Sequence, residues 1–397
     1  MSRYLPLICL AVAHTLVDTC AQFVEPLWPM ISERYSLIGV GSLSVAFIVQ
    51  SLPSSIAQAV FGYLRDLSHL PWLVWAGPIV GVLGMTLLGF TETKIGLGLL
   101  LILGGLGIGA FHPEAVVLAG RLVPEHRTRA ISIFMLGGAC GLAIGPIVSG
   151  AIVRSFGLKG LAWLCIPMVL LVFLLLKIGQ WGDRQNESKH LSQSRSFSEM
   201  FEGRGKIAMA LFLICSLRLV PNMGMNKVLS FVLYQRGYDQ LGIGLHQSLF
   251  LFSAGAGMFL IALRFRPGWE KRFMIFCPLA GVPFLGILGW NDCPQWLFLV
   301  SICLLGLAIW GTSPAMVSYA QQLFPKGAGF ASALTMGVSW GMGGLIQAPI
   351  TAYYSGKETP ELACWVFLPC LLLASLGACF LPGVNSQARP AGENQRA

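Results

Sequence analysis

Long, uninterrupted apolar stretches are the feature of this 397-residue sequence that most restricts its fold. A helix needs roughly 20 mostly apolar residues to cross the hydrocarbon core of a bilayer. Strands of a membrane barrel alternate apolar and polar residues, whereas the runs here are continuous. The sequence therefore predicts an all-α membrane protein with twelve transmembrane helices, at approximate positions 5–31, 41–64, 72–91, 95–120, 130–153, 160–179, 207–234, 241–263, 272–290, 295–320, 328–354 and 361–381.

The composition agrees with a chain whose solvent is lipid. Charged residues make up 11% and hydrophobic residues 55% of the chain, whereas ordinary soluble domains are about 25% charged. The mean hydropathy is +0.72. So few charges exclude a cytosolic enzyme, a secreted disulfide scaffold and a disordered protein. The first stretch carries polar residues and no clean cleavage site, so we expect a retained helix rather than a signal peptide.

The distribution of Lys and Arg predicts which way the spans point. Most basic residues of the loops lie on the side that carries both termini and the segment 180–206. Cytoplasmic loops of membrane proteins are enriched in Lys and Arg. We therefore expect a multi-pass protein of the cell inner (cytoplasmic) membrane with both termini in the cytoplasm. The net charge of +9 then reflects topology and contact with membrane lipid, and nucleic acid is not an expected partner.

The eleven cysteines form no C-x-x-C pair. Most of them lie within apolar runs, where a cysteine behaves as a small buried hydrophobe. We therefore expect no metal and no cofactor. The chain also lacks the G-x-x-x-x-G-K-[ST] loop that cradles nucleotide phosphates, so any uphill transport must draw on an ion gradient or a partner.

The chain divides into two halves of one plan. The only long polar interior segment predicts an N-terminal six-helix bundle at 1–179, a cytoplasmic linker at 180–206, a C-terminal six-helix bundle at 207–383 and a polar tail at 384–397. Motifs recur at an offset of about 200 residues. They pair Tyr35, Gly39 and Gly41 with Tyr238, Gly242 and Gly244; Pro113, Ala119 and Pro124 with Pro314, Ala320 and Pro325; and Ser132, Gly137 and Gly141 with Ser332, Gly337 and Gly341. Parallel repeats of this kind typify transporters that bind substrate between the halves, near the midplane.

Polar side chains inside two spans fall on narrow helix faces. Ionisable groups at bilayer depth are costly and usually face the bundle interior or an aqueous path. Stripes of this kind predict cavity walls, with structural polar contacts between helices as the alternative, chiefly for Gln22 and Glu25. Asp18 and Arg218 lie at roughly matched depths in their spans, so we expect them to pair across the cavity. Lys227 lies opposite the Arg218 face near the outer end of its span, so we expect it to extend to the membrane interface. The stripes comprise His14, Asp18, Gln22 and Glu25 in the first span, and Arg218, Asn222 and Asn226 in the seventh.

His112 and Glu114 flank Pro113 in the fourth span. A proline in a helix predicts a kink, but a kink alone does not explain two ionisable neighbours. Their repeat partners Ser313 and Ala315 are neutral. Only one half carries these titratable groups, a pattern typical of proton coupling, because a buried carboxyl and a histidine can both change charge near neutral pH.

Small residues line one face of the fifth and eleventh spans. They include Gly141, Gly145 and Pro146 in the fifth span, and Gly341 and Gly344 in the eleventh. Helix faces that consist of small residues let neighbouring helices approach closely. A packing role is therefore at least as well supported as direct contact with a ligand.

Several of these motifs resemble the major facilitator superfamily and, within it, the fosmidomycin-resistance-like antiporter group. The resemblance covers nearly the whole chain. It implies export of antibiotics in exchange for protons, by rocking of the two halves. Gly62 and Asp66 match the signature of the loop after span two, where Leu67 replaces an expected Arg. The other matching motifs are His14-x-x-x-Asp18-x-x-x-Gln22, Phe111-His112-Pro113-Glu114, Gly141-x-x-x-Gly145-Pro146, Tyr319-Ala320-Gln321-x-Leu323-x-Pro325 and Gly341-Met-Gly-Gly344.

The sequence thus predicts a monomeric secondary transporter, not an enzyme, that exports a small organic compound, anionic or drug-like, by proton antiport. Import of a metabolite by proton symport is the alternative, and the residues hardly separate the two. A membrane sensor or enzyme is disfavoured because the sequence has no H-E-x-x-H motif and no soluble output domain. The expected cavity residues, for protons or substrate, are His14, Asp18, Gln22, His112, Glu114, Arg218, Asn222 and Asn226, with Gly62, Asp66, Pro113, Gly141, Gly145, Pro146, Gly341 and Gly344 in gating or packing motifs.

Overall fold

The computed structural model describes residues 4–67, 70–183, 203–266, 268–325 and 328–383. This part of the chain is helical and contains no strand, so the predicted all-α fold is confirmed. Ten of its helices or joined helices are long and apolar enough to cross a membrane. Helices α7 and α14 occupy the other two predicted spans. Most of the predicted linker and the tail lie outside the described residues.

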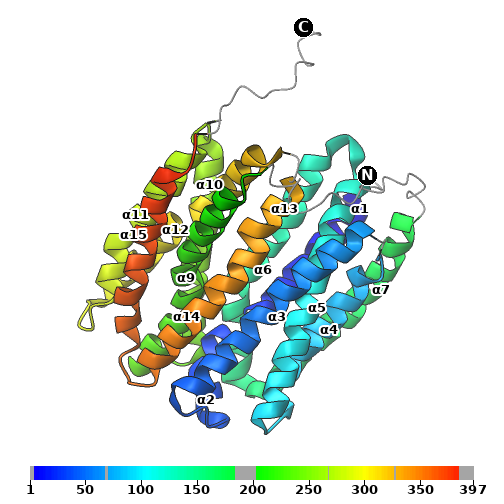
Figure 1. The fold of residues 1–397 in the computed structure, drawn as a ribbon. Helices are drawn as coiled ribbons and strands as arrows, with labels where there is room; N and C mark the ends of the chain where they lie inside the picture. The colour runs from blue at the N-terminus through cyan, green and yellow to red at the C-terminus, as the bar shows by residue number, and fades with distance from the viewer. Residues whose placement is uncertain (1–3, 68–69, 184–202, 267, 326–327, 384–397) are drawn as a thin grey trace.

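The helices follow the order of the apolar runs (Figure 1). The first half contains α1 (Tyr4–Ala21), η1 (Glu25–Leu27), α2 (Trp28–Arg34), α3 (Gly39–Leu67), α4 (Leu73–Thr86), α5 (Lys94–Leu122), α6 (Arg127–Phe156) and α7 (Cys165–Asp183). The second half contains α9 (Gly205–Gln235), α10 (Gln240–Arg264), α11 (Glu270–Leu288), α12 (Gln295–Leu323), α13 (Ala328–Ala333), α14 (Ser339–Ser355) and α15 (Ala363–Phe380).

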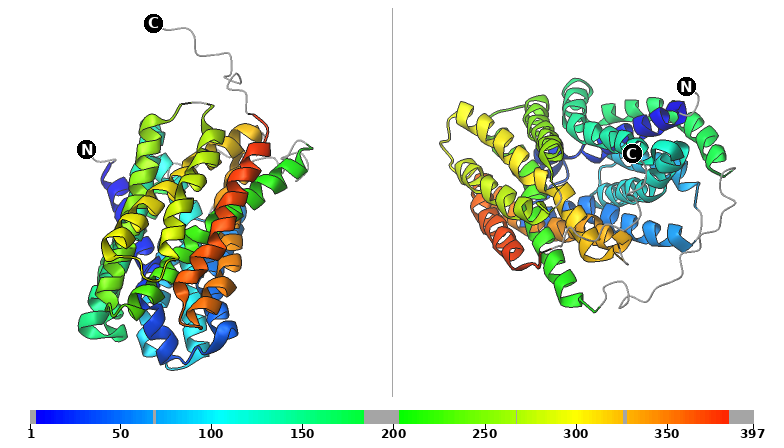
Figure 2. Two further views of the ribbon diagram at one scale, coloured as in Figure 1. Left: turned by 90° about the vertical axis from the view of Figure 1, so that its left-hand side faces the viewer. Right: turned by 90° about the horizontal axis from the view of Figure 1, so that it is seen from above.

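Among the residues that the structure describes, one apolar cluster lies mainly in the first half, and two lie mainly in the second. In the first half α1 lies on α6, and α5 lies against both α3 and α4. In the second half α12 lies against α10 and α11, while α15 contacts α9 and α11. The halves meet along two helix pairs, α3 with α14 and α6 with α10, and lie side by side when seen from above (Figure 2).

Two predicted spans are not regular helices along their whole length. The first span is interrupted after Ala21 and resumes through η1 and α2, because Pro26 and Pro29 supply no backbone N–H to continue the α-helical ladder. The eleventh span contains a π-helical turn at Leu334–Val338, where Ser339 Oγ donates to the Leu334 carbonyl. A π-helical turn inserts one extra residue and shifts the register of the following helix face.

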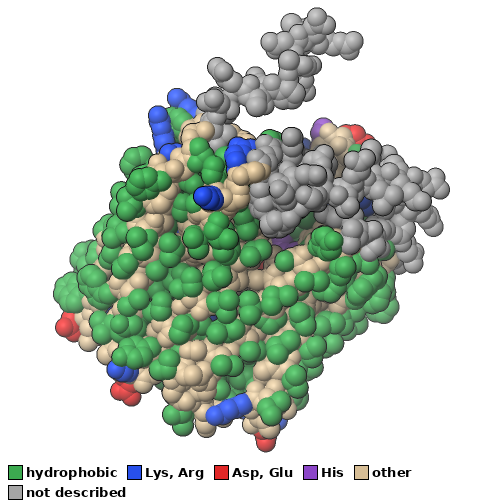
Figure 3. All heavy atoms as spheres, in the orientation of Figure 1, with side chains coloured by type: hydrophobic (Ala, Val, Ile, Leu, Met, Phe, Trp, Pro, Cys, Tyr) green, Lys and Arg blue, Asp and Glu red, His purple; other side chains and the backbone are tan. Residues whose placement is uncertain are grey.

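The surface fits a membrane environment (Figure 3). Apolar side chains cover the middle of the visible face, and charged side chains lie mainly toward its two ends. Leu103, Leu170, Phe173 and Phe259 are among the large apolar side chains exposed along the helices. Such a surface would be unfavourable in water and matches the hydrocarbon region of a bilayer.

Close helix contacts explain the glycines of the fifth and eleventh spans. A Cβ atom at Gly145 would lie 2.6 Å from the carbonyl oxygen of Thr19 in α1. A Cβ atom at Gly344 would lie 2.9 Å from Ser51 Oγ in α3. Real Cβ atoms are not found at such distances, so these glycines permit α6 to approach α1, and α14 to approach α3.

Candidate functional site

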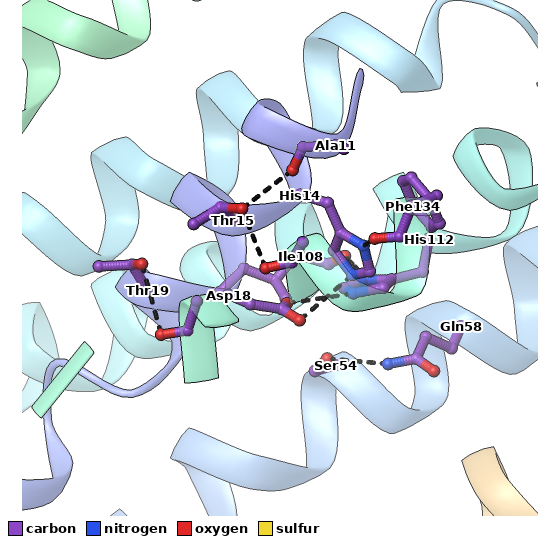
Figure 4. Close-up of polar contacts among 12 residues, drawn as sticks. Ala11, His14, Thr15, Asp18, Thr19, Ser54, Gln58, Ile108, His112 and Phe134 are labelled. Carbon is purple, nitrogen blue, oxygen red and sulfur yellow. Dashed lines mark hydrogen bonds and ion pairs between the residues drawn. The ribbon is translucent and has the colours of Figure 1, made fainter. Parts of the chain in front are cut away.

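Three ionisable side chains form a buried cluster inside the first half, which we call the His14–Asp18–His112 triad (Figure 4). His14 and Asp18 lie one turn apart on α1, and His112 reaches them from α5. The Nε2 atom of His14 lies 3.2 Å from Asp18 Oδ2, and the Nε2 atom of His112 lies 3.2 Å from Asp18 Oδ1. Each carboxylate oxygen therefore has its own imidazole partner.

Backbone carbonyl groups fix the orientation of both imidazoles. His14 Nδ1 lies 2.8 Å from the carbonyl oxygen of Phe134 in α6. His112 Nδ1 lies 2.7 Å from the carbonyl oxygen of Ile108 in its own helix. The His14 ring also stacks on the Phe134 ring, with centroids 4.0 Å apart. Both rings are thus held with Nε2 directed at Asp18.

The triad is shielded unevenly from its surroundings. The side chains of His14 and Asp18 are 3% and 9% exposed, whereas that of His112 is 23% exposed. His112 is therefore the member with the most open access. The three groups offer ligand atoms within 4.8 Å of one another. That spacing is also compatible with one metal ion, so the absence of a metal stays a prediction.

Gly138 of α6 lies directly against the triad, a role that the sequence pattern did not reveal. A Cβ atom there would lie 2.5 Å from His14 Nε2 and 2.7 Å from Asp18 Oδ2. We expect Gly138→Ala to displace the triad and to cost about 1–3 kcal/mol, the usual range for overpacking. Thermal unfolding of the purified protein measures this cost.

Gly98→Ala is the matched control for Gly138→Ala, because a Cβ atom at Gly98 in α5 meets nothing within 4 Å. An alanine in a helix interior is favoured over glycine by up to about 1 kcal/mol, so the control should be neutral or stabilising. Equal unfolding temperatures for the two variants would contradict the assigned role of Gly138.

Arg218 in α9 occupies the position in the second half that the internal repeat relates to Asp18. Its Nη1 atom donates to the carbonyl oxygen of Ile309 and to Ser313 Oγ, both at 3.1 Å. The expected pairing of Asp18 with Arg218 is therefore wrong, because each group is bonded within its own half. The repeat explains why: an offset of about 200 residues relates Asp18 to Arg218 and His112 to Ser313.

Several buried polar atoms have no hydrogen-bond partner within the described residues. They are Arg218 Nε, both side-chain polar atoms of Asn222, Asn226 Oδ1 and Gln22 Oε1. An unsatisfied buried polar group costs roughly 1–3 kcal/mol. Such atoms are candidates for contacts with a bound molecule or with water.

A second buried charge pair joins the two halves. Lys227 Nζ lies 3.0 Å from Glu25 Oε1 and 3.2 Å from Gln50 Oε1. The Lys227 side chain is 1% exposed, so the expectation that it extends to the membrane interface is wrong. A helical projection places Lys227 away from the Arg218 face, but the projection cannot reveal a partner contributed by η1 of the other half.

Further contacts between the halves lie near this pair. Ser230 Oγ donates to the Glu25 carbonyl oxygen, and Tyr234 donates to Glu33 Oε1 at 2.6 Å. We call the region of η1, α2 and the C-terminal part of α9 the closed end. It lies opposite the end where α1 begins and α15 ends (Figure 1).

Comparison with known proteins identifies the family. Residues 10–348 match the family model described as Major Facilitator Superfamily. The chain belongs to this superfamily. It is 27% identical to the fosmidomycin resistance protein of Escherichia coli (strain K12), over 94% of this chain and 91% of the relative. It is 26% identical to the uncharacterized MFS-type transporter YfnC of Bacillus subtilis (strain 168), over 92% of this chain and 90% of the relative.

Solved superfamily structures share the fold. The nucleoside transporter NupG matches with a TM-score of 0.74 at 12% identity, over 96% of this chain and 98% of that chain. An inward-facing, unoccupied bacterial homolog of the human lysosomal transporter Spinster matches with a TM-score of 0.70 at 13% identity, over 95% of this chain and 96% of that chain. The predicted family resemblance is confirmed, and the chain is a transporter rather than an enzyme.

The superfamily loop motif lies beside Glu114 in this structure. A Cβ atom at Gly62 in α3 would lie 3.9 Å from Pro113 in α5. Arg65 Nε, one turn along α3 from Gly62, lies 3.5 Å from Glu114 Oε2. Glu114 therefore contacts α3, and its role in coupling stays a prediction. The Asp66 side chain is outside the described residues.

Proposed function

We propose that the chain is a proton-coupled antiporter that exports a small organic compound, anionic or drug-like, by alternating access. The observation that carries the proposal is the triad: a buried carboxylate whose two oxygens each lie 3.2 Å from the Nε2 atom of a different histidine. Histidine titrates near neutral pH, and a buried cluster that gains or loses a proton changes its charge. Ionisable groups of this kind within membrane helices commonly form proton pathways.

Alternating access supplies the mechanism. The halves are joined at the closed end by the buried Lys227–Glu25 pair, whose Nζ–Oε1 distance is 3.0 Å. With cytoplasmic termini, the closed end would face the outside, and the end where α1 begins and α15 ends would face the cytoplasm. Proton loading of the triad biases the equilibrium between this state and the opposite one, because the two states bind the proton with different affinity.

Arg218 favours an anionic group on the substrate. Its guanidinium is bonded to a carbonyl oxygen and a hydroxyl, and Asp18 is committed to the triad. Guanidinium groups suit carboxylate and phosphate geometry. The side-chain polar atoms of Asn222 and the Oε1 atom of Gln22, which have no partner in the described part of the chain, would supply further polar contacts to a ligand held between the halves. We further propose a monomer in the cell inner membrane, in contact with membrane lipid.

Proteoliposomes with an imposed pH gradient test this function. Radiolabelled fosmidomycin, the compound named in the Escherichia coli relative, serves as the first probe. We expect it to move against the proton flow, and we expect nigericin, which dissipates the pH gradient, to abolish that movement. Movement in the same direction as protons would establish symport, and a flux indifferent to nigericin would exclude proton coupling.

A further inference from the structure

We infer that the triad holds two exchangeable protons in the conformation seen here, rather than the one that a single carboxylate would carry. The inference deepens the proposed proton coupling and takes its transport meaning from that proposal. It rests on three hydrogen bonds and one ion-pair contact, at 3.2 Å between His14 Nε2 and Asp18 Oδ2, around His14, Asp18 and His112.

The two backbone contacts assign one proton on each ring. A carbonyl oxygen can only accept a hydrogen bond. His14 Nδ1 lies 2.8 Å from the Phe134 oxygen, and His112 Nδ1 lies 2.7 Å from the Ile108 oxygen. Both Nδ1 atoms therefore carry hydrogen, whatever the charge of the triad. In a neutral imidazole the other nitrogen is then a bare acceptor, so both Nε2 atoms lack hydrogen in the neutral rings.

The two contacts to Asp18 then require a proton each. His14 Nε2 and Asp18 Oδ2 are 3.2 Å apart, as are His112 Nε2 and Asp18 Oδ1. Without added protons, each contact would place a nitrogen lone pair against a carboxylate lone pair. One proton would satisfy one contact and leave the other repulsive. Two protons satisfy both and give the triad a net charge of +1, whether a given proton resides on nitrogen or oxygen.

Neighbouring hydroxyl and amide groups do not replace these protons. Thr15 donates to the Gly137 oxygen at 2.9 Å, and Thr19 donates to the Gly141 oxygen. On α3, Gln58 donates to Ser54 rather than to the triad (Figure 4). These donors are directed at other acceptors.

The ionisable neighbours do not replace the protons either. Glu114 on α5 contacts Arg65 of α3 at 3.5 Å. Cys20 on α1 is a free cysteine, and a thiol can be neutral or negatively charged but never positively charged. The positive charge that Asp18 needs within the described residues therefore comes from its two histidine partners.

The consequence is a conformation that depends on proton load. Removing both protons would leave two bare ring nitrogens facing a carboxylate in a buried site, so the triad would separate. The fully loaded triad stabilises the state with the closed end sealed, and the empty triad favours the opposite state. Each cycle then exchanges two protons.

Nitrogen NMR of the full-length protein, labelled with ¹⁵N-histidine in nanodiscs, tests the inference directly. The chain has six histidines, and His14→Gln and His112→Gln assign the two signals of interest. At low pH we expect both nitrogens of both rings to be protonated. At high pH we expect both rings to keep Nδ1–H and to lose the Nε2 proton. A neutral Nε2–H form on either ring, or titration of only one ring, would overturn the inference.

Asp18→Asn is the decisive companion variant. The asparagine amide donates to one Nε2 and accepts from the other, so one added proton instead of two should suffice, and one ring should stay neutral at moderately low pH. Two protonated rings in Asp18→Asn at a pH where both are protonated in the wild type would contradict the count, as would one equivalent of bound metal by elemental analysis. The proteoliposome assay fails or succeeds independently, because it reports coupling and not the number of protons.

Discussion

Replacing Lys227 with methionine is expected to weaken the closed end by about 3–5 kcal/mol, the usual cost of removing one partner from a buried ion pair. The Glu25 carboxylate would be left buried without its cation, and its Oε2 atom already has no hydrogen-bond partner among the described residues. Since 1.4 kcal/mol corresponds to about tenfold in an equilibrium constant, the open population should rise more than a hundredfold. Hydrogen–deuterium exchange of η1, α2 and the end of α9 measures this change.

Two further variants test whether Lys227→Met acts on the closed end specifically or destabilises the whole protein. Arg154 and Asp239 also pair between the halves, at 3.1 Å, but their side chains are 57% and 43% exposed. Exposed pairs contribute only about 0–1 kcal/mol, so Arg154→Met should leave exchange nearly unchanged. The double variant Glu25→Gln with Lys227→Met should recover much of the loss, because no buried charge remains unpaired. Equal exchange in Lys227→Met and Arg154→Met would refute the assignment of a gate.

Replacing Asp18 with asparagine is expected to reduce transport driven by a pH gradient to the background of empty liposomes. Asparagine has nearly the shape of aspartate and can satisfy both imidazoles with one added proton, so folding should persist. The side chain cannot itself ionise, so the negative charge that the triad needs for proton exchange is lost. Flux under an imposed pH gradient measures proton coupling, and counterflow without a gradient measures alternating access alone.

We expect counterflow of the probe to survive in Asp18→Asn, since it requires alternating access but no net proton movement. Glu114→Gln, assayed in parallel, decides whether the carboxylate paired with Arg65 also participates in coupling. Wild-type proton-driven flux in Asp18→Asn would remove Asp18 from the coupling mechanism.

The sequence predicted the helices and the placement of two triad members, His14 and Asp18, on one helix face. Continuous apolar runs gave the spans, because lipid leaves the backbone few alternatives to a helix. The spacing of His14 and Asp18 by four residues placed them on one face. The meeting of His112 with Asp18 depends on how α5 packs against α1, which helix periodicity does not specify.

Errors arose where a partner belonged to another helix. The internal repeat carried the missing signal for Arg218, because it aligns Asp18 with Arg218 and His112 with Ser313. Pairing within each half follows from that alignment, whereas matched depth alone favoured a pair across the cavity. For Lys227, neither periodicity nor the repeat pointed to Glu25. Glu25 lies in η1, a short helix that forms where two prolines interrupt the first span, and a regular helix through this span would not predict its position.

The repeat also places one backbone acceptor at the same position in each half. The Ile108 carbonyl accepts from a histidine, and the Ile309 carbonyl accepts from an arginine. Under the proposed coupling, one half holds a charge that can leave with its proton, while the other holds a charge that is permanent at physiological pH. Each change of proton load would then alter the electric asymmetry between the two bundles, while the charge of Arg218 would persist. The protein would thus respond to membrane voltage differently in its loaded and empty states.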